Sequence, residues 1–142
     1  KQASDFIKKY FAARQPIKDY LDATLNKART LGYVETLFGR RRYTPDVKLS
    51  NPAMRAAAER AAMNMPIQGT EADLMKMAML KVENITGASQ IMQVHDSIMV
   101  ECAETDAERV AREMKDIMEN VYPEIGVYLL VDVKYGHSWA EL

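Results

Sequence analysis

The chain has 142 residues, 48% of them apolar and 27% charged, which is enough for one compact domain with a hydrophobic core. It has no apolar run of the roughly 18 residues that cross a bilayer, and its opening residues, KQASDFIKKYF, lack the apolar segment of a signal peptide. The net charge of −1 argues against a dedicated nucleic-acid binder. The lone Cys102 excludes an internal disulfide and favours a reducing compartment. We therefore expect a cytoplasmic protein without a membrane partner.

Two helices are predicted at the start of the chain. The first should begin near Ser4, a favourable N-cap residue, and stop before Pro16, which then suits the first turn of the second helix. Gly32 should end the second helix. Apolar side chains recur at helical spacing and give each helix an apolar face: Phe6, Ile7, Tyr10 and Phe11 in the first, and Ile17, Tyr20, Leu21, Leu25 and Ala28 in the second.

A hairpin and a long helix are predicted next. The stretch GYVETLFGRRRYTPD alternates around Gly39, which is typical of a hairpin. Asn51 and Pro52 resemble an N-cap followed by a first-turn proline, ahead of a long helical stretch that continues through TEADLMKMAMLKVEN. Pro66 lies inside this stretch and should kink or interrupt the helix, because proline removes one backbone donor.

The last third of the chain predicts a second hairpin, a helix and a strand. Residues 90–101 should form the hairpin, with Asp96 and Ser97 as its two-residue turn. A capping-box pattern at Thr105 starts the helix, and the alternation in 127–135 is that of a half-buried strand. This order predicts an α+β fold with helices packed on an antiparallel sheet.

Three polar residues of the long helix are spaced by one turn each. Arg60, Asn64 and Gln68 would form a polar row with about 6 Å between neighbours on an unbroken helix. Such a row can contact a duplex in the minor groove, where base edges offer mainly acceptors. A solvated polar stripe, which any surface helix can show, is the alternative.

A carboxylate stands in the apolar hairpin QVHDSIMVE. Asp96 at a tight turn could bind Mg²⁺, which prefers hard oxygen ligands and usually takes one or two carboxylates plus phosphates. His95 could orient a phosphate or a sugar. The alternative is structural, since aspartate is among the commonest turn residues.

Charge is divided unevenly along the chain. Residues 1–60 hold 13 basic and 6 acidic side chains, a net +7, and residues 61–142 hold 6 basic and 14 acidic, a net −8. This division could mark a polyanion-binding face, and the arginines of GRRRY would then contribute to it. It could equally mark two halves that attract each other.

Read together, these segments resemble a known family. The blocks GYVETLFGRRRYTPD, RAAAERAAMNMPIQGTEADLMKMAM, QVHDSIMVE and VDVKYGHSW resemble, in order and separation, the C-terminal part of family A DNA polymerases of the bacterial DNA polymerase I type. The resemblance covers essentially all 142 residues. It implies that residues 1–32 are the last helices of the fingers subdomain and that residues 33–142 are the C-terminal half of the palm.

The resemblance also implies roles for individual residues in a DNA-directed DNA polymerase, which adds deoxynucleotides to a primer 3′ end. Asp96 would be one of two catalytic aspartates that hold a pair of Mg²⁺ ions. Arg60, Asn64 and Gln68 would follow the primer–template minor groove, and His95 would lie against the primer end. Primer–template DNA and deoxynucleoside triphosphates would be the partners.

The sequence departs from the family pattern in two ways. Ser97 stands where the family usually has glutamate after the aspartate. The chain also contains neither the family's upstream DYSQIELR-like strand with the second catalytic aspartate nor the helix that grips the triphosphate. Two-metal phosphoryl transfer requires both ions to be held, so we expect this chain by itself to be inactive.

Two further hypotheses compete with the enzyme. A non-catalytic module could dock on duplex DNA through its basic half. A structural piece of a larger protein could instead expose its apolar helix faces and associate with itself.

Overall fold

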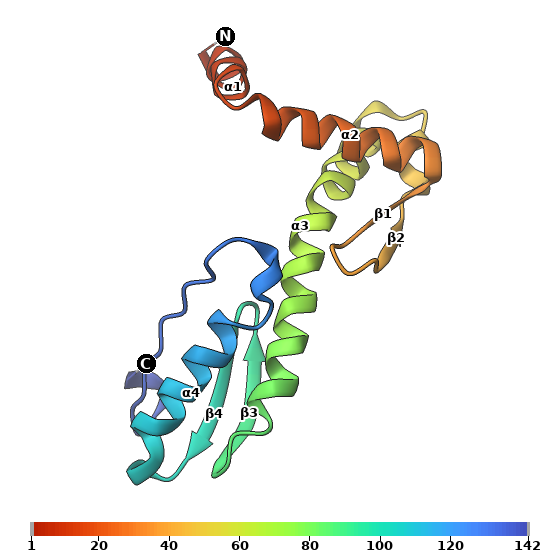
Figure 1. The fold of residues 1–142 in the computed structure, drawn as a ribbon. Coiled ribbons are helices and arrows are strands. Elements are labelled where there is room, and N and C mark those ends of the chain that lie inside the picture. Colours follow the sequence, from red (N-terminus) through yellow and green to blue (C-terminus); the bar gives the residue numbers. More distant parts are fainter. Residues whose placement is uncertain (1, 142) are drawn as a thin grey trace. The chain divides into compact units, whose positions relative to one another are not determined.

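The computed structural model describes residues 2–141, and its contacts divide the chain into two compact units, Lys1–Thr70 and Glu71–Leu142. The helix α3 (Pro52–Val82) contributes residues to both units (Figure 1). Two separate two-stranded antiparallel sheets, one in each unit, confirm the predicted α+β class. Among the described residues no helix is both long and apolar enough to span a bilayer.

The first unit consists of two helices, a hairpin and the first part of α3. Its elements are α1 (Gln2–Ala12), α2 (Gln15–Leu31), β1 (Tyr33–Glu35), β2 (Arg41–Tyr43) and the short 3₁₀ turn Pro45–Lys48 (Figure 1). α1 begins at Gln2 and not near Ser4, because Gln2 and Ala3 are themselves good helix formers. Gly32 ends α2 as predicted, with φ 79°, and its N–H donates to the carbonyl of Ala28 at 3.1 Å.

A small core holds the first unit together. The elements α2, β1, the 3₁₀ turn and α3 each contribute side chains to it, and alanines let the backbones approach closely. Its buried members are Ala28, Val34, Val47, Ala62 and Met65.

The predicted start of α3 is confirmed. Of the predicted kink or interruption at Pro66, the interruption is wrong and the kink stays a prediction. The Asn51 Oδ1 accepts hydrogen bonds from the N–H groups of Ala53 at 3.0 Å and Met54 at 3.2 Å, which is an N-cap. The helix continues through Pro66 without a break. Proline withholds only its own N–H, and the hydroxyl of Thr70 donates to the Pro66 carbonyl at 2.5 Å, one turn later.

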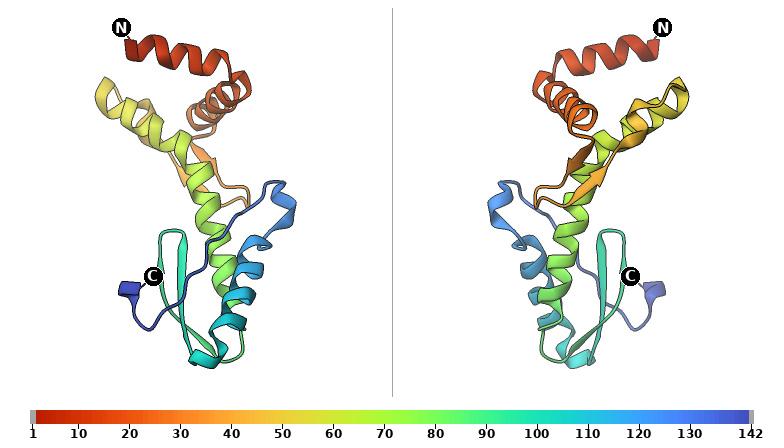
Figure 2. Two further views of the ribbon diagram at one scale, coloured as in Figure 1. Left: turned by 90° about the vertical axis from the view of Figure 1, so that its left-hand side faces the viewer. Right: turned by 90° about the vertical axis from the view of Figure 1, so that its right-hand side faces the viewer.

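The second unit packs a hairpin against two helices. The hairpin strands are β3 (Ala88–Val94) and β4 (Ser97–Cys102), and α4 (Ala107–Glu119) follows them (Figure 2). One face of the hairpin lies on the end of α3 and on α4, where the core side chains are Val82, Ile85, Val110 and Met114. A capping hydrogen bond from Thr105 is not formed, because a 3₁₀ turn over Glu104–Asp106 precedes α4.

The predicted strand at residues 127–135 does not form. No ladder pairs this segment with another in the part of the chain that the structure describes. Its burial nevertheless alternates: Val131 and Val133 are half-buried, while Tyr128 is 98% and Leu130 90% exposed. An alternation of apolar and polar residues indicates that one side of a segment is buried. A strand also requires a neighbouring backbone with which to form hydrogen bonds.

Candidate functional site

The polar row lies on the solvent side of α3. Arg60, Asn64 and Gln68 are all exposed, while Ala62 and Met65 on the same helix are buried in the core of the first unit. Asn64 Nδ2 donates to Gln68 Oε1 at 2.9 Å. Among residues 2–141 the guanidinium of Arg60 has no hydrogen-bond or ion-pair partner, so it is available to an external acceptor.

The β1–β2 turn fastens α3 directly after this row. Arg40 Nη2 donates to the carbonyl of Gly69 at 2.9 Å, and the Leu37 N–H donates to Thr70 Oγ1 at 2.9 Å. A Cβ added at Gly69 would lie 2.7 Å from Cγ2 of Thr36, so only glycine fits. We call these five residues the turn clamp. Sequence reasoning missed it, although a glycine inside a helical pattern was a signal for close packing.

The three arginines of GRRRY do different things. Arg40 belongs to the turn clamp. Arg41 forms an ion pair with Glu35 at 3.4 Å and lies over the ring of Tyr33, 4.4 Å from its centroid. Arg42 is exposed and has no partner within the described part of the chain. Of the three arginines predicted to contact phosphates, Arg42 is therefore the one without another partner among the described residues.

The carboxylate of Glu35 on β1 forms an ion pair with Lys27 on α2, and this pair makes the stability of the fold depend on pH. A hydrogen bond from Lys27, with further help from Arg41 and against partial burial, holds the pKa of Glu35 below its ordinary value of 4.5. A lowered folded-state pKa contributes stability above the unfolded pKa, and this stability is lost as the pH falls through the folded value. We expect Glu35→Gln to lower the melting temperature near pH 7, and this loss should shrink as the pH falls below the ordinary value of 4.5. Thermal melts against Glu83→Gln, an exposed control, measure this, and a pH-independent difference would contradict it.

Asp96 stands at the tip of the β3–β4 hairpin, in a turn that lies one residue earlier in the chain than predicted. Val94 pairs with Ser97, so the turn residues are His95 and Asp96. His95 has φ 51°, a left-handed conformation that costs a non-glycine residue about 1 kcal/mol or more. Two side chains brace this turn: Ser97 Oγ donates to the Val94 carbonyl at 2.8 Å, and Gln93 Nε2 donates to the His95 carbonyl.

Asp96 is the one carboxylate of this two-residue turn. Asp96 is exposed and its carboxylate has no partner in the part of the chain that the structure describes. No group of three or more His, Cys, Asp or Glu side chains among residues 2–141 could hold a metal ion. The hydroxyl of Ser97 is directed back to the turn. A lone exposed carboxylate suits Mg²⁺ only when phosphates and waters supply the other ligands.

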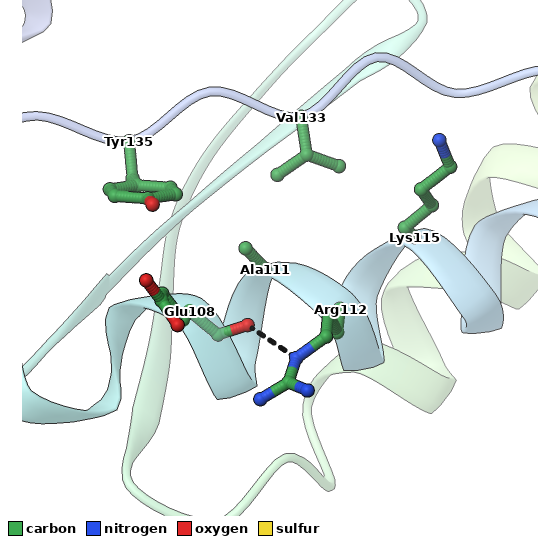
Figure 3. Close-up of a pocket in the computed structure, with 6 residues that line it drawn as sticks. All are labelled: Glu108, Ala111, Arg112, Lys115, Val133 and Tyr135. Carbon is green, nitrogen blue, oxygen red and sulfur yellow. Dashed lines mark hydrogen bonds between the residues drawn. The ribbon is translucent and has the colours of Figure 1, made fainter.

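A shallow groove lies elsewhere in the second unit. In Figure 3, Val133 and Tyr135 of the C-terminal segment face Ala111 on α4. The Nε of Arg112 is already engaged with the carbonyl of Glu108 at 3.2 Å. The groove contains none of the residues predicted for the site.

The charge division coincides with the two compact units. Residues 61–70 carry no charged side chain, so the first unit keeps the net +7 and the second the net −8. The polar row therefore belongs to the basic unit and Asp96 to the acidic one. That Asp96 and the row meet at one nucleic-acid end stays a prediction.

Comparisons with known proteins cover nearly the whole chain. The family model described as DNA polymerase family A matches residues 1–141. DNA polymerase I, thermostable, of Thermus aquaticus is 47% identical over 142 residues, which are 97% of this chain and 17% of the relative. DNA polymerase I of Deinococcus radiodurans is 46% identical over 141 residues, covering 97% of this chain and 15% of the relative.

A solved structure has a similar fold. The POL domain of Pol1 from M. smegmatis, in complex with DNA primer-template and dNTP, superimposes with a TM-score of 0.78 at 37% sequence identity. The match covers 86% of this chain and 22% of the other. The chain thus spans about a sixth to a fifth of the lengths of the proteins it resembles.

Proposed function

This chain belongs to DNA polymerase family A, and from that membership we propose that it is a segment of a DNA-directed DNA polymerase, which adds deoxynucleotides to a primer 3′ end. The observation that carries the proposal is the match over residues 1–141, which includes every predicted site residue. We assign residues 1–32 to the fingers and residues 33–142 to the palm. The free thiol of Cys102 agrees with a cytoplasmic location.

The basic first unit supplies the contact with primer–template DNA in this proposal. Arg60, which has no partner among residues 2–141, and the exposed amides of Asn64 and Gln68 offer donors to minor-groove acceptors and phosphates. The turn clamp keeps the end of the row in place directly after Gln68.

We expect Arg60→Ala and Gln68→Ala each to weaken duplex affinity about three- to tenfold, because each removes donors whose hydrogen bonds contribute on the order of 1 kcal/mol. Fluorescence anisotropy with a labelled primer–template at low salt measures this effect. Lys8→Ala is the matched control, since it removes a charge from the same unit outside the row. Unchanged affinity in both row variants would remove the minor-groove assignment.

The second unit supplies Asp96 as a metal ligand in this proposal. Its carboxylate is exposed and has no partner in the described part of the chain, which leaves it available to share Mg²⁺ with substrate phosphates. When bound, the pair of Mg²⁺ ions would stabilise the charge that develops on the attacking and leaving oxygens. His95, next to Asp96 on the turn, would contact the primer end.

The isolated 142-residue chain is expected to be inactive. Within it, Asp96 is the one carboxylate we assign to metal binding, and nothing is assigned to neutralise a triphosphate. A primer-extension assay with the purified chain, Mg²⁺ and all four deoxynucleoside triphosphates should yield no product. Template-directed extension that survives repurification of the chain would refute this expectation.

A non-catalytic DNA-binding module is the second candidate, and the concentration of positive charge in the first unit favours it. Self-association is a third property to test, because α1 buries none of its residues and Phe6 is 71% and Ile7 55% exposed. Primer extension by the full-length parent separates the polymerase from the module. Sedimentation of the isolated chain as a monomer at all concentrations would exclude self-association.

A further inference from the structure

Within the polar row, the Asn64–Gln68 hydrogen bond has a direction. The amide nitrogen of Asn64 donates and the amide oxygen of Gln68 accepts, at 2.9 Å across one helical turn. A side-chain amide has one acceptor oxygen and two donor hydrogens. Since the oxygen of Gln68 is engaged with Asn64, both of its N–H groups remain available to an external partner.

We propose that Asn64 is a positioning residue that fixes the Gln68 amide with its N–H groups toward the duplex. This inference rests on the proposed function, in which the row contacts the minor groove. Every base pair presents acceptors there, A N3 and T O2 among them, while only guanine adds a donor. Outward N–H groups therefore meet a partner at any base pair, and an outward oxygen would meet one only at guanine.

The hydrogen bond from Asn64 is the one described contact that can select the orientation of the Gln68 amide. Gln68 is exposed, and Asn64 is the only hydrogen-bond partner that its side chain has among residues 2–141. The two orientations of a solvated amide are otherwise nearly equivalent. The backbone beneath is held by the buried Met65 on one side and by the turn clamp at Gly69 on the other, so the freedom that remains at Gln68 lies in its side-chain torsions, the amide rotation among them.

The test is a double-mutant cycle in the 142-residue chain, read as affinity for a labelled primer–template at low salt. Asn64→Asp replaces the donor with a carboxylate, which can only accept and therefore takes an N–H of Gln68. With Gln68 present, we expect this variant to weaken binding about tenfold; in the Gln68→Ala background we expect about threefold, from the added charge and the lost contact of Asn64 itself. Asn64→Ala should weaken binding about twofold more with Gln68 present than in the Gln68→Ala background, where only the contact of Asn64 itself is lost.

The outcomes separate the inference from the proposed function. If Gln68→Ala leaves affinity unchanged, the row does not contact DNA, and the proposed contact and this inference both fail. If Gln68→Ala weakens binding but each Asn64 substitution has the same effect in both backgrounds, the contact stands and the positioning role is overturned.

A second readout requires no DNA. In ¹H–¹⁵N spectra of the free chain, one Gln68 Nε2–H resonance should move downfield in Asn64→Asp, because it then donates to a carboxylate. It should show no such shift in Asn64→Ala. Both side chains are exposed, so neither variant disturbs the core. An unmoved Gln68 resonance in Asn64→Asp would overturn the inference.

Discussion

Asp96→Ala in the full-length parent polymerase is expected to lower the rate of nucleotide addition about a thousandfold or more, while duplex affinity stays within about twofold. A metal ion supplies several kcal/mol of stabilisation to the transition state of phosphoryl transfer, and each 1.36 kcal/mol is a factor of ten in rate. The carboxylate is exposed and has no partner in the described part of the chain, so its removal leaves the fold unchanged. Single-turnover primer extension gives the rate, and anisotropy gives the affinity.

Asp132→Ala is the matched control for this variant. Asp132 is an exposed carboxylate in the same acidic unit, and the proposed mechanism gives it no role. We expect it to keep the parent rate. A parent polymerase that retains synthesis after Asp96→Ala would overturn the catalytic assignment of this residue.

Gly69→Ala is expected to destabilise the first unit by about 1–2 kcal/mol, although alanine is the better helix former. Alanine gains about 1 kcal/mol in helix propensity. Against this gain, the new methyl group would lie 2.7 Å from Cγ2 of Thr36, a β-branched side chain that is 4% exposed. Overpacking of this kind costs typically about 1–3 kcal/mol, and backbone movement would also loosen the Arg40–Gly69 hydrogen bond. The loss should lower the melting temperature by about 5 °C or more.

Thr36→Ser supplies the control for Gly69→Ala. It removes the obstructing methyl group and keeps the hydroxyl, which accepts from the Arg40 N–H at 3.2 Å. In the double variant the clash is relieved, so Gly69→Ala should become neutral or stabilising. An equal loss of stability in both backgrounds would show that the methyl contact is not the reason for glycine.

The elements defined by local chemistry could be predicted from the sequence. Gly32 ends a helix because left-handed backbone is easy for glycine, and Asn51 caps one because its side chain reaches two N–H groups. The exposure of Arg60, Asn64 and Gln68 followed from helical spacing, and the placement of Asp96 at a hairpin tip followed from a charge inside an apolar run.

Features that depend on distant partners could not be predicted. The alternation in 127–135 appears as alternating burial, but pairing depends on a second backbone, and the Val131 N–H instead donates to Glu119 at 3.1 Å. The turn clamp joins residues about thirty positions apart, so only the unexplained Gly69 hinted at it.

In the proposed mechanism, Asp96 and the polar row serve the same primer end. Disulfide cross-linking tests this directly, with single cysteines placed by Asp96→Cys or Gln68→Cys in a full-length parent that carries Cys102→Ser and no other reactive thiol. Each variant is offered duplexes tethered with a thiol at successive base pairs. Both positions should cross-link within about three base pairs of the primer terminus, because the proposed function places Asp96 and the Gln68 end of the row at that terminus. Cross-links from the two positions that lie a full helical turn of DNA apart would contradict the proposed mechanism.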